Sequence, residues 1–167
     1  MAKARNLKKA SNHFWLFALL LAMAVGGCSL SHDYRSTGGA WHKSDTLLFG
    51  HHIETEVDNP VDIFAGIRYS AAYPYKDLWL QIDVVAGDSL VSRDSICCDI
   101  YDENGRRNGT TAGILYQEEY FVSSKDIPSY QPFDIRITHL MGDTLLQGIY
   151  DVGIRLVPRG RHLPSER

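Results

Sequence analysis

The sequence predicts an all-β fold: a single antiparallel β-sandwich of the jelly-roll or immunoglobulin-like kind, placed after an N-terminal lipoprotein leader. Three observations lead to this prediction. Apolar and polar residues alternate in several segments, turn-forming residues separate those segments, and no segment after the leader shows the periodicity of an amphipathic helix. The chain beyond the leader is long enough for one domain with a buried core.

The leader occupies residues 1–27 and has the parts of a secretory signal peptide. A basic stretch precedes an apolar run from Phe14 to Val25, and no acidic residue occurs before Asp33. The basic residues are Lys3, Arg5, Lys8 and Lys9. The apolar run is shorter than the roughly twenty residues that a transmembrane helix needs, so a plain membrane span is the weaker interpretation.

The last residues of the leader and the cysteine after them form a more specific motif than a general signal peptide has. Val25-Gly26-Gly27-Cys28 resembles the bacterial lipobox, in which an aliphatic residue and two small residues precede a cysteine. The resemblance implies that the Cys28 thiol carries a diacylglycerol and its amino group an acyl chain after cleavage. Three acyl chains would hold the protein at the membrane permanently, since one chain alone binds only marginally. The alternative is an ordinary signal peptide followed by an incidental cysteine. No other cofactor is expected.

The expected strands follow in order. Leu78, Leu80, Ile82 and Val84 share one face, and Phe133, Ile135 and Ile137 share another, as in half-buried strands. The expected strands are Val61–Tyr69, Leu78–Val84, Leu90–Tyr101, Leu115–Val122, Phe133–Thr138 and Val152–Leu156. Turn residues lie between them, at Asn59-Pro60, Tyr73-Pro74, Gly87-Asp88, Asn104-Gly105, Asn108-Gly109, Pro128 and Gly142-Asp143. We therefore expect a tether over 28–39, the sandwich over 40–158 and a polar tail over 159–167.

The charge of the mature chain excludes one class of partner. The whole chain has a net charge of −3, from 17 Lys and Arg against 20 Asp and Glu. Four of the basic residues lie in the leader, which leaves 13 against 20, a net charge of −7, for the mature chain. An acidic domain is unsuited to nucleic acid, so we expect no nucleic-acid partner.

Two adjacent cysteines lie within the segment Leu90–Tyr101. Alternation places Cys98 on the face of Ile96 and Ile100 and Cys97 on the opposite face, so the two are badly placed to form a disulfide with each other. We interpret Cys98 as a small core residue and Cys97 as a free thiol. The alternative is an intermolecular disulfide through Cys97.

Two patterns invite an enzymatic or metal-binding interpretation. Gly87-Asp88-Ser89-Leu90 matches the nucleophile block of GDSL esterases, but strand-like sequence follows it and the mature chain lacks the Asp-x-x-His of that family. His51 and His52 would point to opposite faces of a strand and show no zinc spacing. We therefore expect no catalytic residue, no small-molecule substrate and no metal site.

A short pattern recurs in the mature chain: Asp, a hydroxyl residue, then an aliphatic residue. It is similar to the acceptor triplet of the O-glycosylation systems of Bacteroidota. The candidate acceptor hydroxyls belong to Thr46, Ser89, Ser95 and Thr144. The alternative for each is a turn Asp followed by the first residues of a strand.

Several blocks, taken in order, resemble the GldH family of gliding-motility lipoproteins of Bacteroidota. After the lipobox come Ala40–Phe49, "IRYSAAYPYKDLWLQI" (Ile67–Ile82), "DSICCDIYDENGRRNG" (Asp94–Gly109) and "GIYDVGIRL" (Gly148–Leu156). One departure is Arg107, which stands where relatives tend to have Trp. The resemblance carries over only Cys28, as the lipidated residue.

The resemblance implies a non-enzymatic, lipid-anchored outer-membrane protein that faces the periplasm. It would be an accessory of the gliding machinery and of the associated type IX secretion system, and its partners would be other envelope proteins. Trp41, Tyr73, Tyr75 and Trp79 are the candidate interface residues, because they lie close together in sequence and Trp79 falls on the face opposite Leu78 and Leu80. The alternative is a surface-exposed glycan-binding lipoprotein that uses the same aromatic side chains.

Overall fold

The computed structural model describes residues 33–52, 60–127 and 130–159. These residues form strands and turns, and none of them lies in a helix that could cross a membrane. The strands are β1 (Asp33–Ser36), β2 (Ala40–His42), β3 (Leu47–His52), β4 (Val61–Ser70), β5 (Asp77–Ala86), β6 (Ser89–Asp99), β7 (Thr110–Ala112), β8 (Leu115–Lys125), β9 (Pro132–His139), β10 (Leu145–Gln147) and β11 (Ile149–Pro158).

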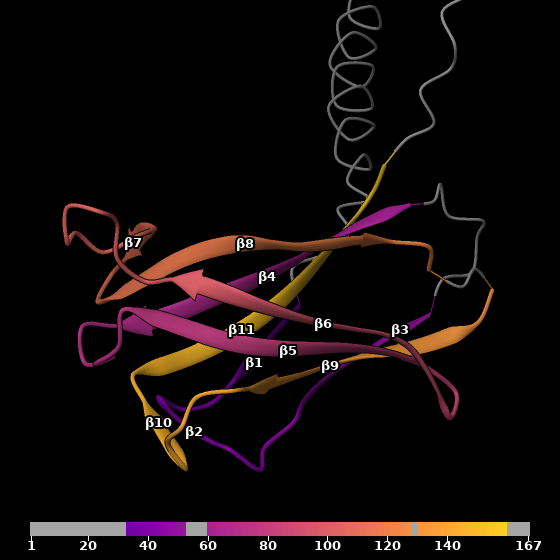
Figure 1. Cartoon of the computed structure of the whole chain (residues 1–167), viewed down its shortest axis with the longest axis horizontal. Coiled ribbons are helices and arrows are strands. Elements are labelled where there is room, and N and C mark those ends of the chain that lie inside the picture. Colours follow the sequence, from indigo (N-terminus) through magenta and orange to yellow (C-terminus); the bar gives the residue numbers. More distant parts are fainter. Residues whose placement is uncertain (1–32, 53–59, 128–129, 160–167) are drawn as a thin grey trace, which may run out of the picture. The chain divides into compact units, whose positions relative to one another are not determined.

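The strands form two main antiparallel sheets, which confirms the predicted β-sandwich. One sheet has five strands in the order β1-β11-β4-β8-β7, and the other has four in the order β3-β9-β5-β6. A small pair, β10-β2, lies beyond one end of the strands (Figure 1). The chain crosses between the main sheets at β4 to β5, at β6 to β7 and at β8 to β9.

Alternation of apolar residues explains the core between the sheets. Ile63, Ala65, Ile67 and Tyr69 of β4 and Leu78, Leu80, Ile82 and Val84 of β5 are almost completely buried and belong to one hydrophobic cluster. Val152 and Ile154 of β11 and Ile135 and Ile137 of β9 extend that cluster within the two sheets. Each such side chain contributes roughly 1.5–3 kcal/mol to stability through burial.

The six strands expected from the sequence are present as β4, β5, β6, β8, β9 and β11. The expected tether over 28–39 is wrong at its C-terminal end, because Asp33–Ser36 is strand β1 of the five-stranded sheet. β1 is short and polar, and its place in the sheet comes from hydrogen bonds to β11 rather than from an apolar face. The folded domain therefore includes residues before Ala40.

Tyr34 holds β1 onto the outer face of the five-stranded sheet. Its ring lies over Gly153 of β11 and Gly66 of β4, where any Cβ would collide with it. The guanidinium of Arg68 lies 4.0 Å from the centre of the Tyr34 ring. Burial raises the pKa of the Tyr34 hydroxyl, and Arg68 opposes that rise. A short strand without a hydrophobic face is thus fixed by one aromatic side chain.

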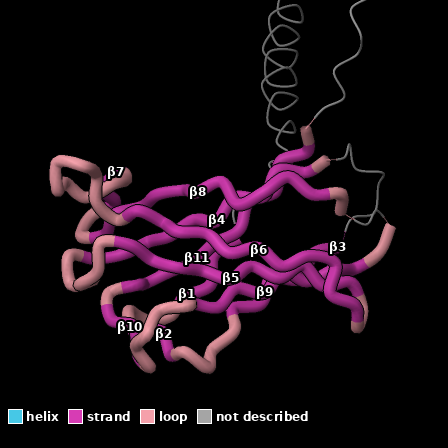
Figure 2. The backbone as a smooth tube through the Cα atoms, viewed as in Figure 1, coloured by secondary structure: helices cyan, strands magenta, loops and turns pink. Residues whose placement is uncertain are grey.

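The loops gather at the two ends of the strands (Figure 2). We call one of them the near end: it contains the last residues of β5, β8 and β11 and the first residues of β4, β6 and β9. We call the other the far end: it contains the β4–β5 and β6–β7 connections and the small β10-β2 pair. Because β1 runs antiparallel to β11, its first residue, Asp33, is the end of β1 that faces the near end.

Candidate docking surface

The predicted interface aromatics divide into two groups. Trp79 is 44% exposed on the outer face of the four-stranded sheet. Trp41 and Tyr73 are each 1% exposed, so the prediction that they form an interface is wrong. The Trp41 ring packs edge-on against His139, with centroids 5.1 Å apart, and its Nε1 donates to the Asp45 carbonyl at 3.1 Å. Trp41 therefore anchors β2 on the core.

The Tyr-Pro-Tyr block, Tyr73 to Tyr75, packs its first tyrosine into the interior at the far end. Tyr73 packs edge-on against both Tyr69 and Tyr75, and its hydroxyl donates to the Asp77 carbonyl at 2.7 Å. Burial raises the pKa of the Tyr73 hydroxyl strongly. Tyr75 is partly exposed and donates to the Asp143 carboxylate, a hydrogen bond that raises the pKa of Tyr75. The block fixes the β4–β5 connection, with Tyr73 buried and Pro74 and Tyr75 at the surface.

Trp79 lies at the centre of an exposed apolar surface that we call the Trp79 surface: Trp79, Cys97, Leu140 and Met141. Cys97 is the cross-strand partner of Trp79 on β6. Leu140, also 44% exposed, donates its backbone N–H to the Trp79 carbonyl at 2.8 Å. The Trp79 N–H donates to the Met141 sulfur at 3.4 Å. A tryptophan in an apolar surrounding is the kind of residue that contributes most to protein interfaces.

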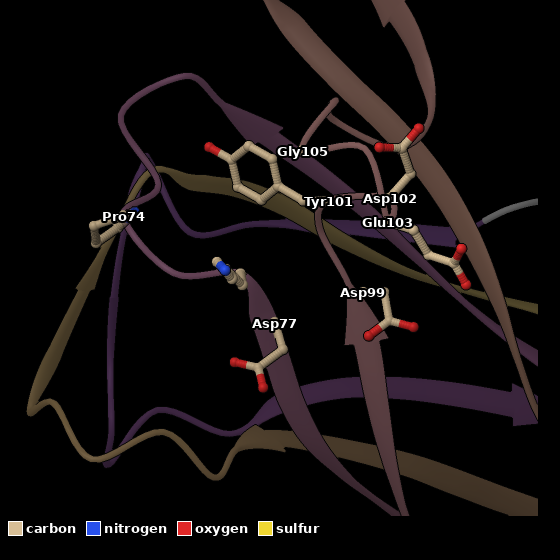
Figure 3. A pocket seen from close by; sticks show the side chains of 8 residues that line it. Pro74, Asp77, Asp99, Tyr101, Asp102, Glu103 and Gly105 are labelled. Carbon is tan, nitrogen blue, oxygen red and sulfur yellow. The ribbon is translucent and has the colours of Figure 1, made fainter.

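A hollow of about 570 Å³ adjoins this surface at the far end. Four of its eight lining residues are acidic, and the lining consists of Pro74, Lys76, Asp77, Asp99, Tyr101, Asp102, Glu103 and Gly105. Asp77 and Asp99 lie side by side on neighbouring strands, and the ring of Tyr101 lies toward Pro74 (Figure 3). The Trp79 Nε1 donates to the Asp77 carboxylate at 3.3 Å, so Asp77 belongs to both features. The arrangement suits a partner that presents an apolar side chain beside a basic one.

The wall of the hollow is a turn organised by Asp102. Its carboxylate accepts the backbone N–H groups of Asn104 and Arg106, both at 2.8 Å, and these hydrogen bonds keep the pKa of Asp102 low. Arg107 lies 4.8 Å from the centre of the Tyr101 ring and donates to the Ala71 carbonyl at 2.9 Å. Arg107 thus ties the turn to the β4–β5 connection.

The two cysteines face opposite sides of β6, as predicted. Cys98 is buried among core residues and Cys97 is exposed, and neither forms a disulfide. Burial raises the pKa of the Cys98 thiol strongly. Burial also raises the pKa of the Cys97 thiol, and the carboxylates of Asp77 and Asp99 act in the same direction. Both thiols therefore remain protonated and slow to react near neutral pH.

Among the described residues, Ser89 and His139 lie toward opposite ends of β5. Ser89 is exposed at the near end, beside the tight Gly87-Asp88 turn, and pairs with Ala86. His139 is buried and pairs with Leu80, close to the other end of β5. Burial lowers the pKa of His51, whose ring stacks on Phe133 with centroids 5.4 Å apart. Within the described ranges, no group of three or more His, Cys, Asp or Glu side chains is placed to hold a metal ion.

The predicted lipid attachment site lies outside the described residues, whereas the predicted glycan attachment sites lie within them. Cys28 lies outside the described residues, so its lipidation stays a prediction. The four candidate acceptors of sugar, Thr46, Ser89, Ser95 and Thr144, are all exposed. Exposure makes these hydroxyls accessible, and whether any of them carries a glycan stays a prediction as well.

The fold and the surface define the class of this protein: a β-sandwich with an exposed apolar surface around Trp79 at one end. Comparison with known families identifies the particular group. The profile of the GldH lipoproteins matches residues 29–156, and the chain belongs to that family. It is 20% identical over 148 residues to the gliding motility lipoprotein GldH of Flavobacterium johnsoniae, which covers 84% of this chain and 92% of that protein.

Solved structures show only distant likenesses. The carbohydrate-binding module CBM28, specific for non-crystalline cellulose, matches with a TM-score of 0.40 and 11% identity over 76% of this chain and 73% of that one. Latent PorU from Porphyromonas gingivalis matches with a TM-score of 0.31 and 8% identity over 78% of this chain and 12% of that one. The identification of the family therefore rests on the match to the family profile.

Proposed function

We propose that this protein is an outer-membrane lipoprotein that faces the periplasm and acts without catalysis as an accessory of the gliding machinery and of type IX secretion. Membership of the GldH family supports the link to motility. The lipobox supports attachment through acyl chains on Cys28. The protein would act by binding another envelope protein, since the resemblance supplies no catalytic residue.

The observation that carries the binding role is the Trp79 surface. Nearly half of the Trp79 side chain is open to solvent, although its neighbours Leu78 and Leu80 are completely buried. Leu140 and Met141 extend the apolar area, and Asp77 and Asp99 supply charge beside it. Burying a tryptophan of this kind at an interface commonly contributes about 2 kcal/mol or more to binding. The partner is expected to contact this surface.

The test is to delete the gene in its native host and complement it with the wild type, Trp79→Ala or Phe121→Ala. Phe121 is a matched control because it is 52% exposed on the outer face of the opposite sheet, where it pairs with Phe64. Colony spreading and the proteome of the culture medium are measured in parallel. We expect Trp79→Ala to behave like the deletion and Phe121→Ala like the wild type, at equal protein levels.

The two readouts separate the two parts of the proposed role. Retention of type IX cargo inside the deletion strain places the protein in secretion, with loss of spreading as a consequence. Intact secretion with loss of spreading places it in the motility apparatus. If both readouts are unchanged in the deletion strain, the proposed function is wrong.

The glycan-binding alternative is weakened by the burial of Trp41 and Tyr73. A glycan platform built from several rings would need these two side chains at the surface, and both are in the core. Orientation provides a direct test between the two roles. Protease added to intact cells should spare a lipoprotein that faces the periplasm and should cleave one that is exposed on the cell surface.

A further inference from the structure

Asp33, the first described residue, is the end of β1 that faces the near end of the sandwich. Asp33 lies opposite Ile154 on β11, and β11 continues to Pro158, which pairs with Val61. Val61 also pairs with Lys125, the last residue of β8. The chain then crosses to Pro132, the first residue of β9, so the same end of the molecule includes the four-stranded sheet.

The link between Cys28 and Asp33 is too short to separate the domain from a membrane. Five residues span at most roughly 18 Å even when fully extended. Along the sheet, the four residues from Ile154 to Pro158 already cover about 13 Å. Even a link fully extended along the direction of β1 would thus place Cys28 only several ångströms beyond the near end.

Exposed apolar side chains lie at this end. Leu90 is 52% exposed and Val91 45% exposed, both at the start of β6, and Tyr130 is 63% exposed two residues before β9. We call these three residues the near-end tip. Leucine and valine are the residue types that enter the apolar part of a bilayer, and tyrosine is enriched at the membrane–water interface.

A β-bulge places the first two of these side chains outward. Val84 pairs with Ser92 and Val85 pairs with Leu90, so Val91 has no cross-strand partner. Without this extra residue, the alternation that buries Cys98 would turn Leu90 inward. Tyr130 has a positive φ of 60°, which is uncommon for a bulky side chain. Two local irregularities of the backbone thus expose apolar side chains at the same end.

Among the described residues near the tip, three cations are paired with carboxylates. Arg93 pairs with Asp83 at 2.7 Å, Lys125 with Asp94 at 3.2 Å and Arg159 with Asp62 at 3.1 Å. Attraction to anionic headgroups would need unpaired cations. Contact with a membrane at this end would therefore depend on the apolar side chains and on the acyl chains, and it would be insensitive to salt.

We propose that the near end of the sandwich docks on the lipid bilayer, with Leu90, Val91 and Tyr130 entering the interface beside the acyl chains. This inference rests on the proposed lipid anchor at Cys28. It gives the domain a fixed orientation, in which the far end, with Trp79 and the hollow, points away from the membrane and toward a partner.

The test uses the full-length lipidated protein in vesicles of phosphatidylcholine and phosphatidylethanolamine, with and without bromine on the acyl chains. Val91→Trp places a fluorophore at the tip, and Leu140→Trp places one at the far end as the matched control. The native Trp41 and Trp79 lie at the far end and provide the background. We expect bromine to quench the added tryptophan of Val91→Trp and to leave Leu140→Trp at the background level.

A second measurement avoids adding an apolar side chain to the tip. Hydrogen exchange of residues 87–93 is compared between detergent and vesicles, in the wild type and in the double variant Leu90→Ser with Val91→Ser. We expect vesicles to protect this segment in the wild type and not in the variant, at low and high salt alike. Because both side chains are exposed, the variant should fold as the wild type does.

The outcomes separate this inference from the proposed anchor. If the protein floats with vesicles but neither measurement shows contact at the tip, docking is wrong and the anchor stands. Quenching of Leu140→Trp equal to that of Val91→Trp also overturns the docking orientation. If the wild type fails to float and behaves as Cys28→Ser does, the anchor and the docking inference both fail.

Discussion

The ring of Tyr34 lies against the backbone of Gly153, so closely that a Cβ on Gly153 would be 2.7 Å from the ring atoms Cδ1 and Cε1. The two residues are also cross-strand partners in the β1–β11 pair. Because Gly153 has no side chain, the Tyr34 ring reaches across it to Gly66 on β4. This contact joins the segment that follows the leader to the last strand of the domain.

Gly153→Ala should displace Tyr34 and weaken β1. The variant loses part of the burial of an aromatic ring and its cation–π contact with Arg68, so we expect a loss of about 2–3 kcal/mol in the free energy of unfolding. Urea denaturation measures this loss. Gly50→Ala is the control, because its Cβ would meet only the Asp134 carboxylate at 3.4 Å. A control that loses as much as Gly153→Ala would contradict this explanation.

Gly148→Ala should be more damaging still. Gly148 has a φ of +88°, and a Cβ there would lie 2.7 Å from the Tyr73 Cα, on backbone that cannot move aside freely. Strain and collision together should lower the free energy of unfolding by more than about 3 kcal/mol. Gly113 also has a positive φ, of +66°, but no atom lies within 4 Å of the position of an added Cβ. Gly113→Ala should therefore lower the free energy of unfolding by only about 1 kcal/mol. Equal losses in urea denaturation would show that collision plays no part.

Stability should fall as the pH drops below about 6.5, the ordinary pKa of histidine. Burial lowers the pKa of His139, with Lys43 and His42 acting in the same direction and Asp143 opposing them. The His139 side chain is therefore protonated more readily in the unfolded state than in the folded state. As a result, the free energy of unfolding decreases from pH 7 toward pH 5 by up to about 1.4 kcal/mol per pH unit for this site.

Urea denaturation of the wild type and of His139→Phe checks the role of this histidine. Phenylalanine keeps a ring against Trp41 but does not titrate, so the pH dependence should be smaller in the variant. His51, whose pKa burial also lowers, accounts for part of what remains. The difference between the two proteins at pH 8 reports packing alone. An unchanged slope between pH 7 and pH 5 in His139→Phe would contradict the assignment.

The two thiols of β6 should react very differently with Ellman's reagent. We expect Cys97 to react in the folded protein, more slowly than free cysteine because its pKa is raised, and Cys98 to react only after unfolding. Cys97→Ser should abolish the reaction of the folded protein, and Cys98→Ser should leave it unchanged. Rapid labelling of two thiols under native conditions would contradict the burial of Cys98.

A glycan on Ser89 would be incompatible with membrane docking of the near-end tip. The Ser89 hydroxyl adjoins Leu90 at the near-end tip, so a sugar there would keep the tip out of the bilayer interface. We expect peptide mass spectrometry of protein from the native host to find Ser89 unmodified. Thr46 and Thr144, near the far end, are the control positions at which a glycan would not interfere with docking. A glycan on Ser89 would count directly against the docking inference.

Alternation predicted the long strands because each buries one face. β4 and β5 carry apolar residues at every second position, and the structure buries those residues. The short strands gave no such signal. β1 contains four residues, and β2, β7 and β10 contain three each, which is too few to show a period. β3 carries Leu47, Phe49 and His51 on one side, which is too short an alternation to be a strong signal.

The candidate surface could be predicted only in part. The period of β5 places Trp79 outward, and the structure exposes it. Trp41 and Tyr73 were grouped with it because they are close in sequence, but closeness in sequence does not determine which way a side chain points. Leu140 and Met141 could not be found by this reasoning, since β9 brings them beside Trp79 from a distant part of the chain.

The pairing of β1 with β11 sets an order of events for the newly exported chain. The segment that carries the proposed acyl chains emerges first, and the strand that completes its sheet emerges last, with Asp33 opposite Ile154. β1 therefore has no neighbour until almost the whole chain has been exported, and contacts between such distant segments form slowly. Attachment to the membrane can thus precede folding, and the domain would then close its five-stranded sheet while already held at the bilayer.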